Sequence, residues 1–359
     1  MKSTLTIENF KCFKKQEIEF RDLTVLVGAN SVGKSTVVQA LLLSRESLTK
    51  DVIVLNDIYK LNLGNTQEVL NRDSNENLIK FHSKDFPCIS PNMTTVLDVP
   101  KKEDSYELNL KQRLFSPITG LQFNGNIYYL NAERIGPRLN HQVGSSTYPH
   151  VGYMGEYTIQ VFEQMKDESI ALEKAYDKEE RLTYYRQIQL WMDFITPGVE
   201  VSAPKLYEKV RTAQMTFGDS SPTNVGFGVS YILPIILNGL LAEKNSMFIV
   251  ENPEAHLHPF GQSRIGQFLA KIAAAGVQVI VETHSEHVIN GIRLASAKDI
   301  IATNAIQINF FKKEENEVTI VPISINDASD LSLFPKGFFD QVQRDAMEML
   351  RIKKNKNLL

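Results

Sequence analysis

The sequence has few cysteines and no long hydrophobic run. Only Cys12 and Cys88 occur among 359 residues, which is too few for a disulfide framework, so we expect a reducing compartment, the cytoplasm. The longest apolar stretch, Tyr231 to Leu241, contains Pro, Asn and Gly and is far shorter than the ~20 residues of a transmembrane helix. The first ten residues alternate apolar and polar, which predicts a strand rather than a signal peptide. We therefore expect neither membrane insertion nor export.

An excess of basic charge is also missing. The chain has 39 Lys+Arg and 42 Asp+Glu, a formal net charge of −3, so the chain as a whole is not a polycation made to coat nucleic acid. Basic side chains do gather in two places, which we interpret as solvated charge, with a patch that binds a nucleic-acid backbone as the alternative. They are Lys11, Lys14 and Lys15 near the N-terminus, and Arg351, Lys353, Lys354 and Lys356 near the other end.

The apolar runs predict an α/β fold. Residues 23–27 (LTVLV), 247–250 (MFIV) and 277–281 (VQVIV) are continuous apolar runs, typical of strands buried on both faces of a parallel sheet. Alternating residues before position 21 predict an N-terminal antiparallel part, and residues 306–325 predict a closing hairpin. We expect a mostly parallel central sheet with helices on both sides.

The middle of the chain has a different character. It is polar, rich in Asn and Ser, and its segment 167–195 has charged residues at helical spacings. We predict an ATPase core in residues 1–45 and 215–325, a mixed α/β insertion in 46–214 with a helical segment at 160–195, and a C-terminal tail in 326–359. No heptad pattern persists, so long coiled-coil arms are not expected.

Residues 28–35, GANSVGKS, match the P-loop pattern G-x-x-x-x-G-K-[ST] in full, between a predicted buried strand and a predicted helix. Glycines allow the tight turn, while the loop N–H groups and the helix N-terminus point at phosphate oxygens. Lys34 is expected to contact the β- and γ-phosphates, Ser35 to ligate Mg²⁺, and the Thr36 hydroxyl to lie within reach of the phosphates. The predicted nucleotide-binding residues of this loop are Asn30, Ser31, Val32, Gly33, Lys34, Ser35 and Thr36.

Acidic residues follow the strand predicted at 247–250. Glu251 stands at its end, where a P-loop ATPase needs an acid that holds the Mg²⁺ shell; the alternative is a simple capping acid. Hydrolysis also needs a group that orients water. Asn252 cannot act as a base, so Glu254 is the next candidate.

Two further segments complete the predicted site. His284 follows the strand at 277–281 and could hydrogen-bond the γ-phosphate or the attacking water; alone, a structural histidine would be the simpler interpretation. Residues 224–231 contain Gly226, Gly228 and Ser230, whose backbone N–H groups could face a phosphate, although an ordinary glycine turn explains them too.

A zinc site is the competing interpretation of the histidines. His256, His258, His284 and His287 could be assembled with Glu251 and Glu254, but nothing in the sequence fixes them on one side of a pocket. The P-loop pattern explains both strand ends without zinc. No G-x-S-x-G element or Cys–His pairing supports acyl transfer.

In order along the chain, these motifs resemble the ABC-type ATPase heads of the RecF, SMC and OLD (overcoming lysogenization defect) group. The similarity is strongest to the small OLD-like AAA-type ATPases of bacteria. FIVENPEAHLHP with VIVETHS carries most of the resemblance, which extends to residues 127–138, 151–158 and 330–341.

The resemblance implies a head-to-head homodimer that encloses two ATP molecules with Mg²⁺. Gly228 and Ser230 would belong to the signature segment that reaches the partner's γ-phosphate, although the order GFGVS leaves open whether Gly226 or Ser230 replaces the usual serine. His256 and His258 would lie in the loop at the dimer seam, and His284 would be the switch histidine. Asn252 departs from the acid usual at its position, which affects the expected rate of hydrolysis but not ATP binding.

The sequence thus predicts a P-loop ATPase of the ABC-head type whose closure controls an effector protein or nucleic acid. The resemblance suggests defence against phage or a toxin-like partner. A nucleotide-gated scaffold with little or no hydrolysis is the alternative. Asp327, Asp330 and Asp340 are too scattered for a two-metal nuclease centre, so we do not expect this chain to cut DNA.

Overall fold

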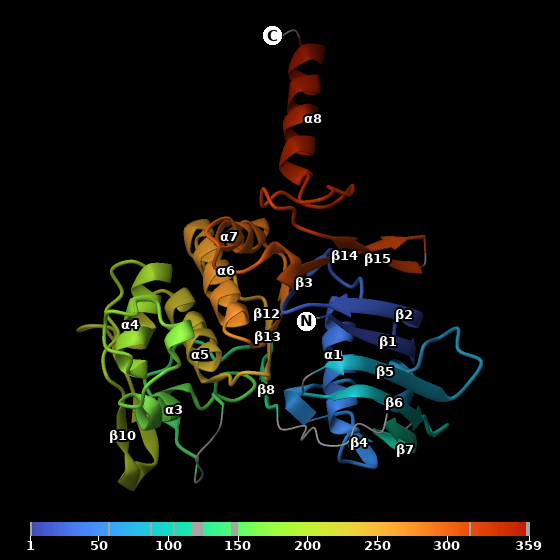
Figure 1. The fold of residues 1–359 in the computed structure, drawn as a ribbon, viewed down its shortest axis with the longest axis horizontal. Helices are drawn as coiled ribbons and strands as arrows, with labels where there is room; N and C mark the ends of the chain where they lie inside the picture. The colour runs from blue at the N-terminus through green and yellow to red at the C-terminus, as the bar shows by residue number, and fades with distance from the viewer. Residues whose placement is uncertain are drawn as a thin grey trace.

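The computed structural model describes residues 2–56, 58–86, 88–102, 105–115, 125–144, 150–315 and 317–356. Within these ranges the strands form three sheets. Helices lie on both faces of the central sheet, and one long C-terminal helix points away from the body (Figure 1). The expected α/β architecture, with a mostly parallel central sheet, is confirmed.

The central sheet brings three apolar strands side by side. β3 (Leu23–Gly28), β13 (Gln278–Thr283) and β12 (Met247–Glu251) are parallel neighbours in that order. Their carboxyl ends share one edge, which is where ligands of open α/β sheets bind. The sheet continues with β8 (Ile127–Leu130) beside β12, and with the predicted hairpin of β14 (Ile306–Glu314) and β15 (Glu317–Ile323) beside β3.

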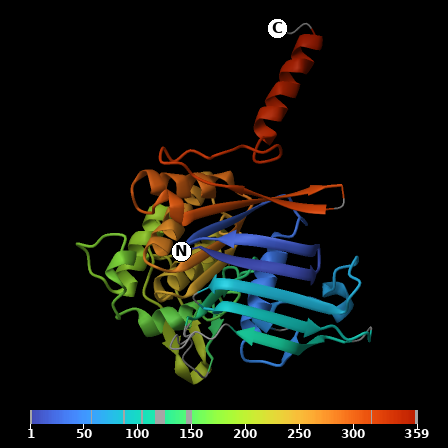
Figure 2. The ribbon, with the colours of Figure 1, turned by 45° about the vertical axis from the view of Figure 1, so that its right-hand side comes forward.

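A second, antiparallel sheet starts from the N-terminal strands, which pair with Leu5 opposite Ile18. Figure 2 shows this sheet beside the central one. Helix α1 (Lys34–Glu46) packs between the two sheets, because its apolar side chains share one core with both. Both sheets therefore hold α1, and with it the loop that precedes it. In sheet order the strands are β2 (Phe13–Phe20), β1 (Ser3–Phe10), β5 (Leu78–Phe86), β6 (Ser90–Asp98), β7 (Glu107–Phe115) and β4 (Val52–Val54).

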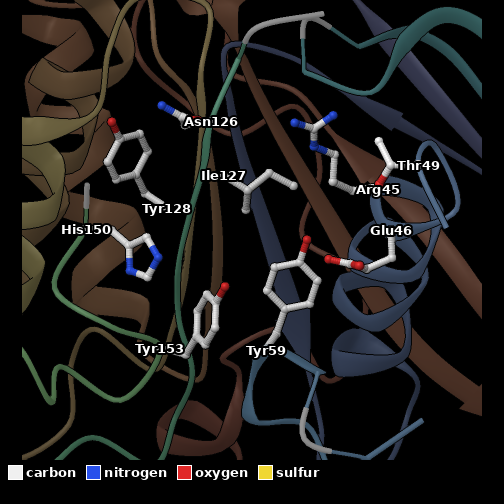
Figure 3. A pocket seen from close by; sticks show the side chains of 9 residues that line it. All are labelled: Arg45, Glu46, Thr49, Tyr59, Asn126, Ile127, Tyr128, His150 and Tyr153. Carbon is white, nitrogen blue, oxygen red and sulfur yellow. The ribbon is translucent and has the colours of Figure 1, made fainter. Parts of the chain in front are cut away.

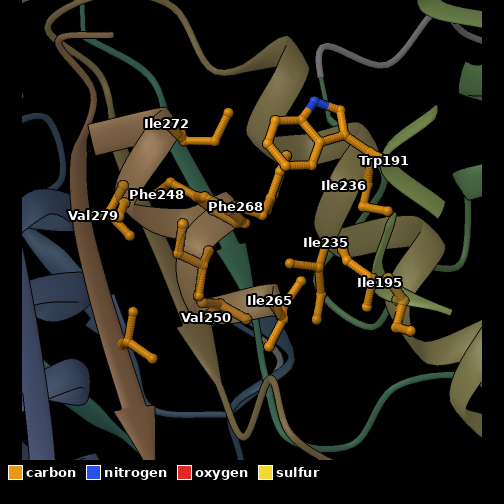
Figure 4. Close-up of a cluster of buried hydrophobic side chains, with 14 of the residues drawn as sticks. Trp191, Ile195, Ile235, Ile236, Phe248, Val250, Ile265, Phe268, Ile272 and Val279 are labelled. Carbon is orange, nitrogen blue, oxygen red and sulfur yellow. The ribbon is translucent and has the colours of Figure 1, made fainter. Parts of the chain in front are cut away.

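A second core lies between the other face of the central sheet and a group of helices. Figure 4 shows part of this core. At its centre the Trp191 ring meets the edge of Phe268, with ring centroids 4.9 Å apart. Each fully buried aromatic side chain of this kind stabilises the fold by roughly 2–3 kcal/mol. The helices are α3 (Thr158–Met165), α4 (Tyr184–Ile195), α5 (Phe227–Leu241), α6 (Pro259–Ala274) and α7 (Glu286–Ala297).

The segment 46–214, predicted as an inserted lobe, contributes strands to both large sheets. Its predicted continuous helix is wrong for residues 167–183, which hold only a short 3₁₀ turn between α3 and α4. Gln187 explains the difference: its side-chain amide donates to the carbonyls of Asp177 and Arg181 and accepts from Tyr176 N. These bonds hold the segment in an extended loop despite its helical charge spacing.

The short elements lie mostly at the periphery. They are α2 (Thr66–Val69), a small sheet of β10 (Lys205–Tyr207), β11 (Thr212–Gln214) and β9 (His141–Gln142), and 3₁₀ turns at Ile58–Lys60, Leu172–Lys174, Glu208–Val210, Pro222–Asn224 and Thr303–Ala305.

The predicted C-terminal tail contains α8 (Gln341–Asn355), which projects from the body with all its residues exposed (Figure 1). Its polar face includes Arg344, which pairs with Asp340. Among the described residues, no helix is long and apolar enough to cross a bilayer.

Candidate functional site

The backbone conformation of the P-loop requires glycine at two positions. Gly28 has φ +149°, and a Cβ there would lie 2.2 Å from the carbonyl oxygen of Phe311 on the neighbouring strand. Gly33 has φ +97° and forms the N-cap of α1 without a side-chain cap. The first N–H groups of α1 therefore have no side-chain partner at the cap, and the positive end of the helix faces the loop.

A cavity of about 420 Å³ opens at this loop. It brings together the P-loop, the end of β12, the end of β13 and the turn between β1 and β2. The side chains and backbone that line it belong to Lys11, Cys12, Asn30, Ser31, Gly33, Lys34, Ser35, Thr36, Gln39, Ala132, Glu251, Asn252, Glu282 and His284. Most predicted loop residues thus line one cavity, while Val32 points into the core between the sheets.

Lys34 is almost fully buried, and its ammonium group donates to the carbonyl oxygens of Gly28 and Ala29 at 3.0 and 2.6 Å. Burial lowers the pKa of Lys34, while the nearby carboxylates Glu282 and Glu254 oppose that shift. Its charge thus lies between the loop and the two acids. A phosphate group in the cavity would meet this cation as its closest charged partner in the loop.

Glu251 is held at the end of β12. Its Oε1 accepts a hydrogen bond from the Tyr129 hydroxyl at 2.9 Å, and the carboxylate also accepts from the backbone of Ala132. Burial nonetheless raises the pKa of Glu251. The structure therefore places the predicted metal-binding acid in the cavity, with its orientation fixed by the neighbouring strand β8.

Glu282 lines the same cavity, and the sequence reasoning assigned it no role. Ser35 donates its hydroxyl to Glu282 Oε1 at 2.9 Å. The side chain is 5% exposed, and burial, together with the nearby charge of Glu251, raises its pKa to about 7. The available signal was its position: like Glu251, it is the first acid after a buried apolar run.

Arg134 holds the turn after Glu251 in place by hydrogen bonds. This role of Arg134 was not predicted from the sequence. Its guanidinium is buried and donates to the carbonyl oxygens of Asn131, Glu251 and Asn252 at 3.1, 2.7 and 2.6 Å. It also lies over the Tyr231 ring, 5.4 Å from the centroid. The Asn252 backbone has φ +46°, so these bonds hold it in an unusual conformation and connect it to α5.

Glu254 does not line the cavity. Its Oε1 accepts from the backbone N–H of His284, and its Oε2 accepts from the Thr283 hydroxyl, both at 2.7 Å. Burial and then the Lys34 charge lower the pKa of His284. The predicted water-orienting acid thus contacts the predicted switch histidine, while only the histidine reaches the cavity.

The signature segment lies elsewhere, at the start of α5. Gly228 packs so tightly on the PEAHLHP loop that a Cβ there would lie 2.6 Å from the His256 carbonyl oxygen. The exposed His256 ring contacts Phe227 and Tyr231, with ring centroids 5.5 and 4.8 Å apart. Neither Gly228 nor Ser230 lines the P-loop cavity. Their contribution to a nucleotide site stays a prediction that requires a second copy of the chain.

The competing zinc site finds no support in the described part of the chain, where no three His, Cys, Asp or Glu side chains form a metal-binding group. His258 instead caps α6 by accepting from Phe260 N. The backbone N–H of His287 donates to Ser285 in the first turn of α7.

The basic clusters separate in the structure. Lys11 turns into the P-loop cavity, where its ammonium donates to Gln39 Oε1 at 2.8 Å. Lys15 pairs with Glu8 at 2.7 Å, and Lys14 is exposed. Of the basic C-terminal residues, Arg351, Lys353 and Lys354 lie on α8 and Lys356 directly follows it. This helix projects from the body (Figure 1). The predicted nucleic-acid patch therefore lacks Lys11 and stays an untested alternative.

A second cavity, of about 280 Å³, lies at the far end of α1 (Figure 3). Arg45, Glu46 and Tyr59 lie on one side of it, and Tyr153 lies on the other. Burial, together with the charge of Glu46 and its hydrogen bond to Tyr59, raises the pKa of Tyr59. None of the predicted site residues lines this second cavity, so it does not belong to the candidate active site at the P-loop.

A solved SMC head shares this fold. The SMC head bound to the C-winged helix domain of ScpA matches with a TM-score of 0.54 at 15% identity, over 90% of this chain and 98% of that one. The SMC head domain from Thermotoga maritima matches at 13% identity, with coverages of 90% and 98% and a TM-score of 0.45. A Pyrococcus furiosus SMC head with an extended coiled coil, bound to the C-terminal domain of ScpA, matches at 14% identity, with coverages of 99% and 100% and a TM-score of 0.49. The first match establishes the fold as that of an SMC-type P-loop ATPase head.

Family models agree with this class. Residues 1–194 and 218–289 match the model described as an AAA ATPase domain, and residues 301–349 match a protein family of unknown function, DUF3696. The first match spans more than half of the sequence, so the chain belongs to the AAA ATPase domain family. A search of the curated proteins gives no significant match.

Proposed function

We propose that this chain binds and hydrolyses ATP at the P-loop cavity, and that bound ATP joins two copies head to head. The observation that carries the proposal is the meeting of Lys34 and Ser35 with the carboxylates of Glu251 and Glu282 in one cavity. A loop cation beside a hydroxyl and acids is the donor set that a magnesium-bound triphosphate needs.

Magnesium fits the donor set. Ser35 and Glu251 would hold it. The buried Glu282 Oε2 has no hydrogen-bond partner in the described part of the chain, so the site has spare acceptor capacity. When bound, Mg²⁺ neutralises phosphate charge. This chain's own residues supply the rest: Tyr129 and Arg134 hold the end of β12, and Glu254 holds the backbone of His284 at the cavity edge.

A nucleotide-gated scaffold is the second candidate, and it is favoured by Asn252, which cannot accept a proton from water. In both cases we propose a cytoplasmic homodimer that controls an effector protein or nucleic acid. The proposed assignment of this chain to the OLD-like subgroup and to defence against phage rests on the sequence motifs alone.

Calorimetry with ATP and Mg²⁺, followed by a phosphate-release assay with and without DNA, tests the proposal. We expect binding and release in the wild type, and loss of high-affinity binding and of release in Lys34→Ala. Binding without release would favour the scaffold. No binding by the wild type would reject both candidates.

A further inference from the structure

Glu282 occupies a position that the proposed nucleotide site does not explain by itself. It is the register partner of Glu251 on the adjacent parallel strand, so their backbones lie about 4.8 Å apart. Two acids at the same strand ends repel each other when both are charged and partly removed from water. Among the described cations, the nearby Lys34 ammonium donates to carbonyl oxygens of the loop, not to either acid.

The hydrogen bonds of Glu282 use only half of its carboxylate. Oε1 accepts from Ser35, while Oε2 is buried and has no partner among the residues that the structure describes. A buried carboxylate oxygen without a partner destabilises the fold, because its hydration is lost and not replaced. A role limited to fixing Ser35 would need one oxygen and no negative charge, so a neutral glutamine would serve as well.

We propose that Glu282 is a second carboxylate of the magnesium site, acting with Ser35 and Glu251. This inference rests on the proposed nucleotide function and adds a residue to it. Mg²⁺ is commonly bound by one or two carboxylates together with substrate phosphates. The Ser35 hydroxyl, which ligates the cation in P-loop sites, already touches Glu282 Oε1, so a cation there lies within reach of the carboxylate. Its charge would relieve the repulsion between the two acids.

The role of Glu282 is measured as the magnesium dependence of nucleotide binding, without turnover. ADP affinity is determined by calorimetry in MgCl₂ and in EDTA, and the dissociation constant in EDTA is divided by the dissociation constant in MgCl₂. This ratio, which exceeds 1 when magnesium strengthens binding, is compared between variants. Glu282→Gln keeps an oxygen that accepts from Ser35 but removes the charge. We expect it to lower the ratio by about tenfold, with binding in EDTA unchanged or tighter.

The matched control is Glu163→Gln. Glu163 also has a buried oxygen that no described residue contacts by a hydrogen bond, but it lies on α3, outside the cavity. The ratio of this variant should therefore equal that of the wild type. Glu282→Asp keeps the charge and should retain most of the magnesium dependence. If Glu282→Gln does not fold, Glu282→Asp decides. A ratio near 1 for this variant, which means that magnesium no longer strengthens binding, would contradict a charge-based role.

The possible results separate the two claims. A wild type that binds no nucleotide overturns the proposed function, and this inference with it. A wild type with magnesium-dependent binding and a Glu282→Gln variant with the same ratio overturns the metal role of Glu282 and leaves the function intact. Loss of hydrolysis in Glu282→Gln at an unchanged ratio likewise overturns the metal role.

Discussion

Glu254 holds the backbone of His284: its Oε1 accepts the His284 N–H at 2.7 Å. Its other oxygen accepts from the Thr283 hydroxyl at the same distance. The acid expected to orient water is thus bound to the strand end that carries the expected switch histidine. Either the carboxylate moves when nucleotide binds, or it acts by positioning His284.

We expect Glu254→Gln to spare ATP binding and to lower the turnover rate. The loss of a general base typically costs about 10²–10⁴ in rate, and the amide can still bond Thr283, whose hydroxyl can reverse its role. Binding is measured by calorimetry and turnover by phosphate release. Hydrolysis at the wild-type rate would place the base elsewhere or in the partner chain.

Thr283→Ala separates the two roles of Glu254. If Glu254 acts by positioning His284, loss of the Thr283 bond should reduce turnover as well, and so should His284→Ala. If Glu254 is the base, Thr283→Ala should have a much smaller effect than Glu254→Gln. The three rates, measured at saturating ATP, distinguish the alternatives.

Lys34→Ala should weaken ATP binding by about 30- to 150-fold, which corresponds to the loss of a charge-assisted hydrogen bond of about 2–3 kcal/mol. Lys34 is the loop's cation, and the first turn of α1 supplies no other. Lys14→Ala, which removes an exposed lysine outside the cavity, is the control and should bind normally. Equal affinities in the wild type and Lys34→Ala would refute the P-loop assignment.

The two cysteines give a direct probe of the cavity. Cys12 is exposed and lines it, 3.9 Å from the Thr36 hydroxyl, whereas Cys88 is fully buried and burial raises its pKa to about 12. A thiol reagent should therefore label one cysteine per chain quickly, and ATP should slow that reaction. Cys12→Ser should remove the fast phase. Labelling at the same rate with and without ATP would place the nucleotide elsewhere.

Lys174 pins the middle of the chain to the end of α5. Its ammonium donates to the carbonyl oxygens of Gly239, Leu240 and Ala242, and burial lowers its pKa to about 8. Between about pH 8 and 10.5 the unfolded chain binds more protons at this lysine than the folded chain, so folding becomes more favourable as pH rises. Lys174→Met loses this dependence.

The measurement is urea unfolding of both proteins at several pH values. We expect Lys174→Met to be less stable at pH 7.5, because three carbonyls lose their donor. The difference in the free energy of unfolding between the wild type and Lys174→Met should widen by up to about 1 kcal/mol for each pH unit from 8 to 10. A difference in the free energy of unfolding that stays constant or shrinks over this range would contradict a Lys174 pKa that is lowered by burial.

The sequence was sufficient to predict features that depend on short, continuous segments of the chain. The P-loop, the strand that ends at Glu251 and the closing hairpin are each visible as short patterns of apolar runs and glycines. Bonds between distant segments left no such pattern: Ser35 and Glu282 are separated by 247 positions, and Arg134 meets Asn252 118 positions later. Charge spacing also predicted helix in residues 167–183, where tertiary bonds from Gln187 hold a loop instead.

The dimer prediction depends on the separation between the P-loop cavity and the start of α5. Gly228 and Ser230 lie outside the cavity of their own chain, so they can contribute to a nucleotide site only in a second copy. A ligand that binds the joined pair preferentially must shift the population towards it. ADP lacks the γ-phosphate that the second chain would contact, and so should shift it little.

Sedimentation velocity of the wild type and Ser230→Arg, with ATP, with ADP and without nucleotide, tests this switch most directly. We expect ATP with Mg²⁺ to raise the fraction of dimer, or to make an existing dimer more compact, in the wild type alone, because an arginine at position 230 fills the seam. Glu254→Gln should strengthen the effect by slowing hydrolysis. Identical sedimentation in all three conditions, for a protein shown to bind ATP, would contradict ATP-driven closure.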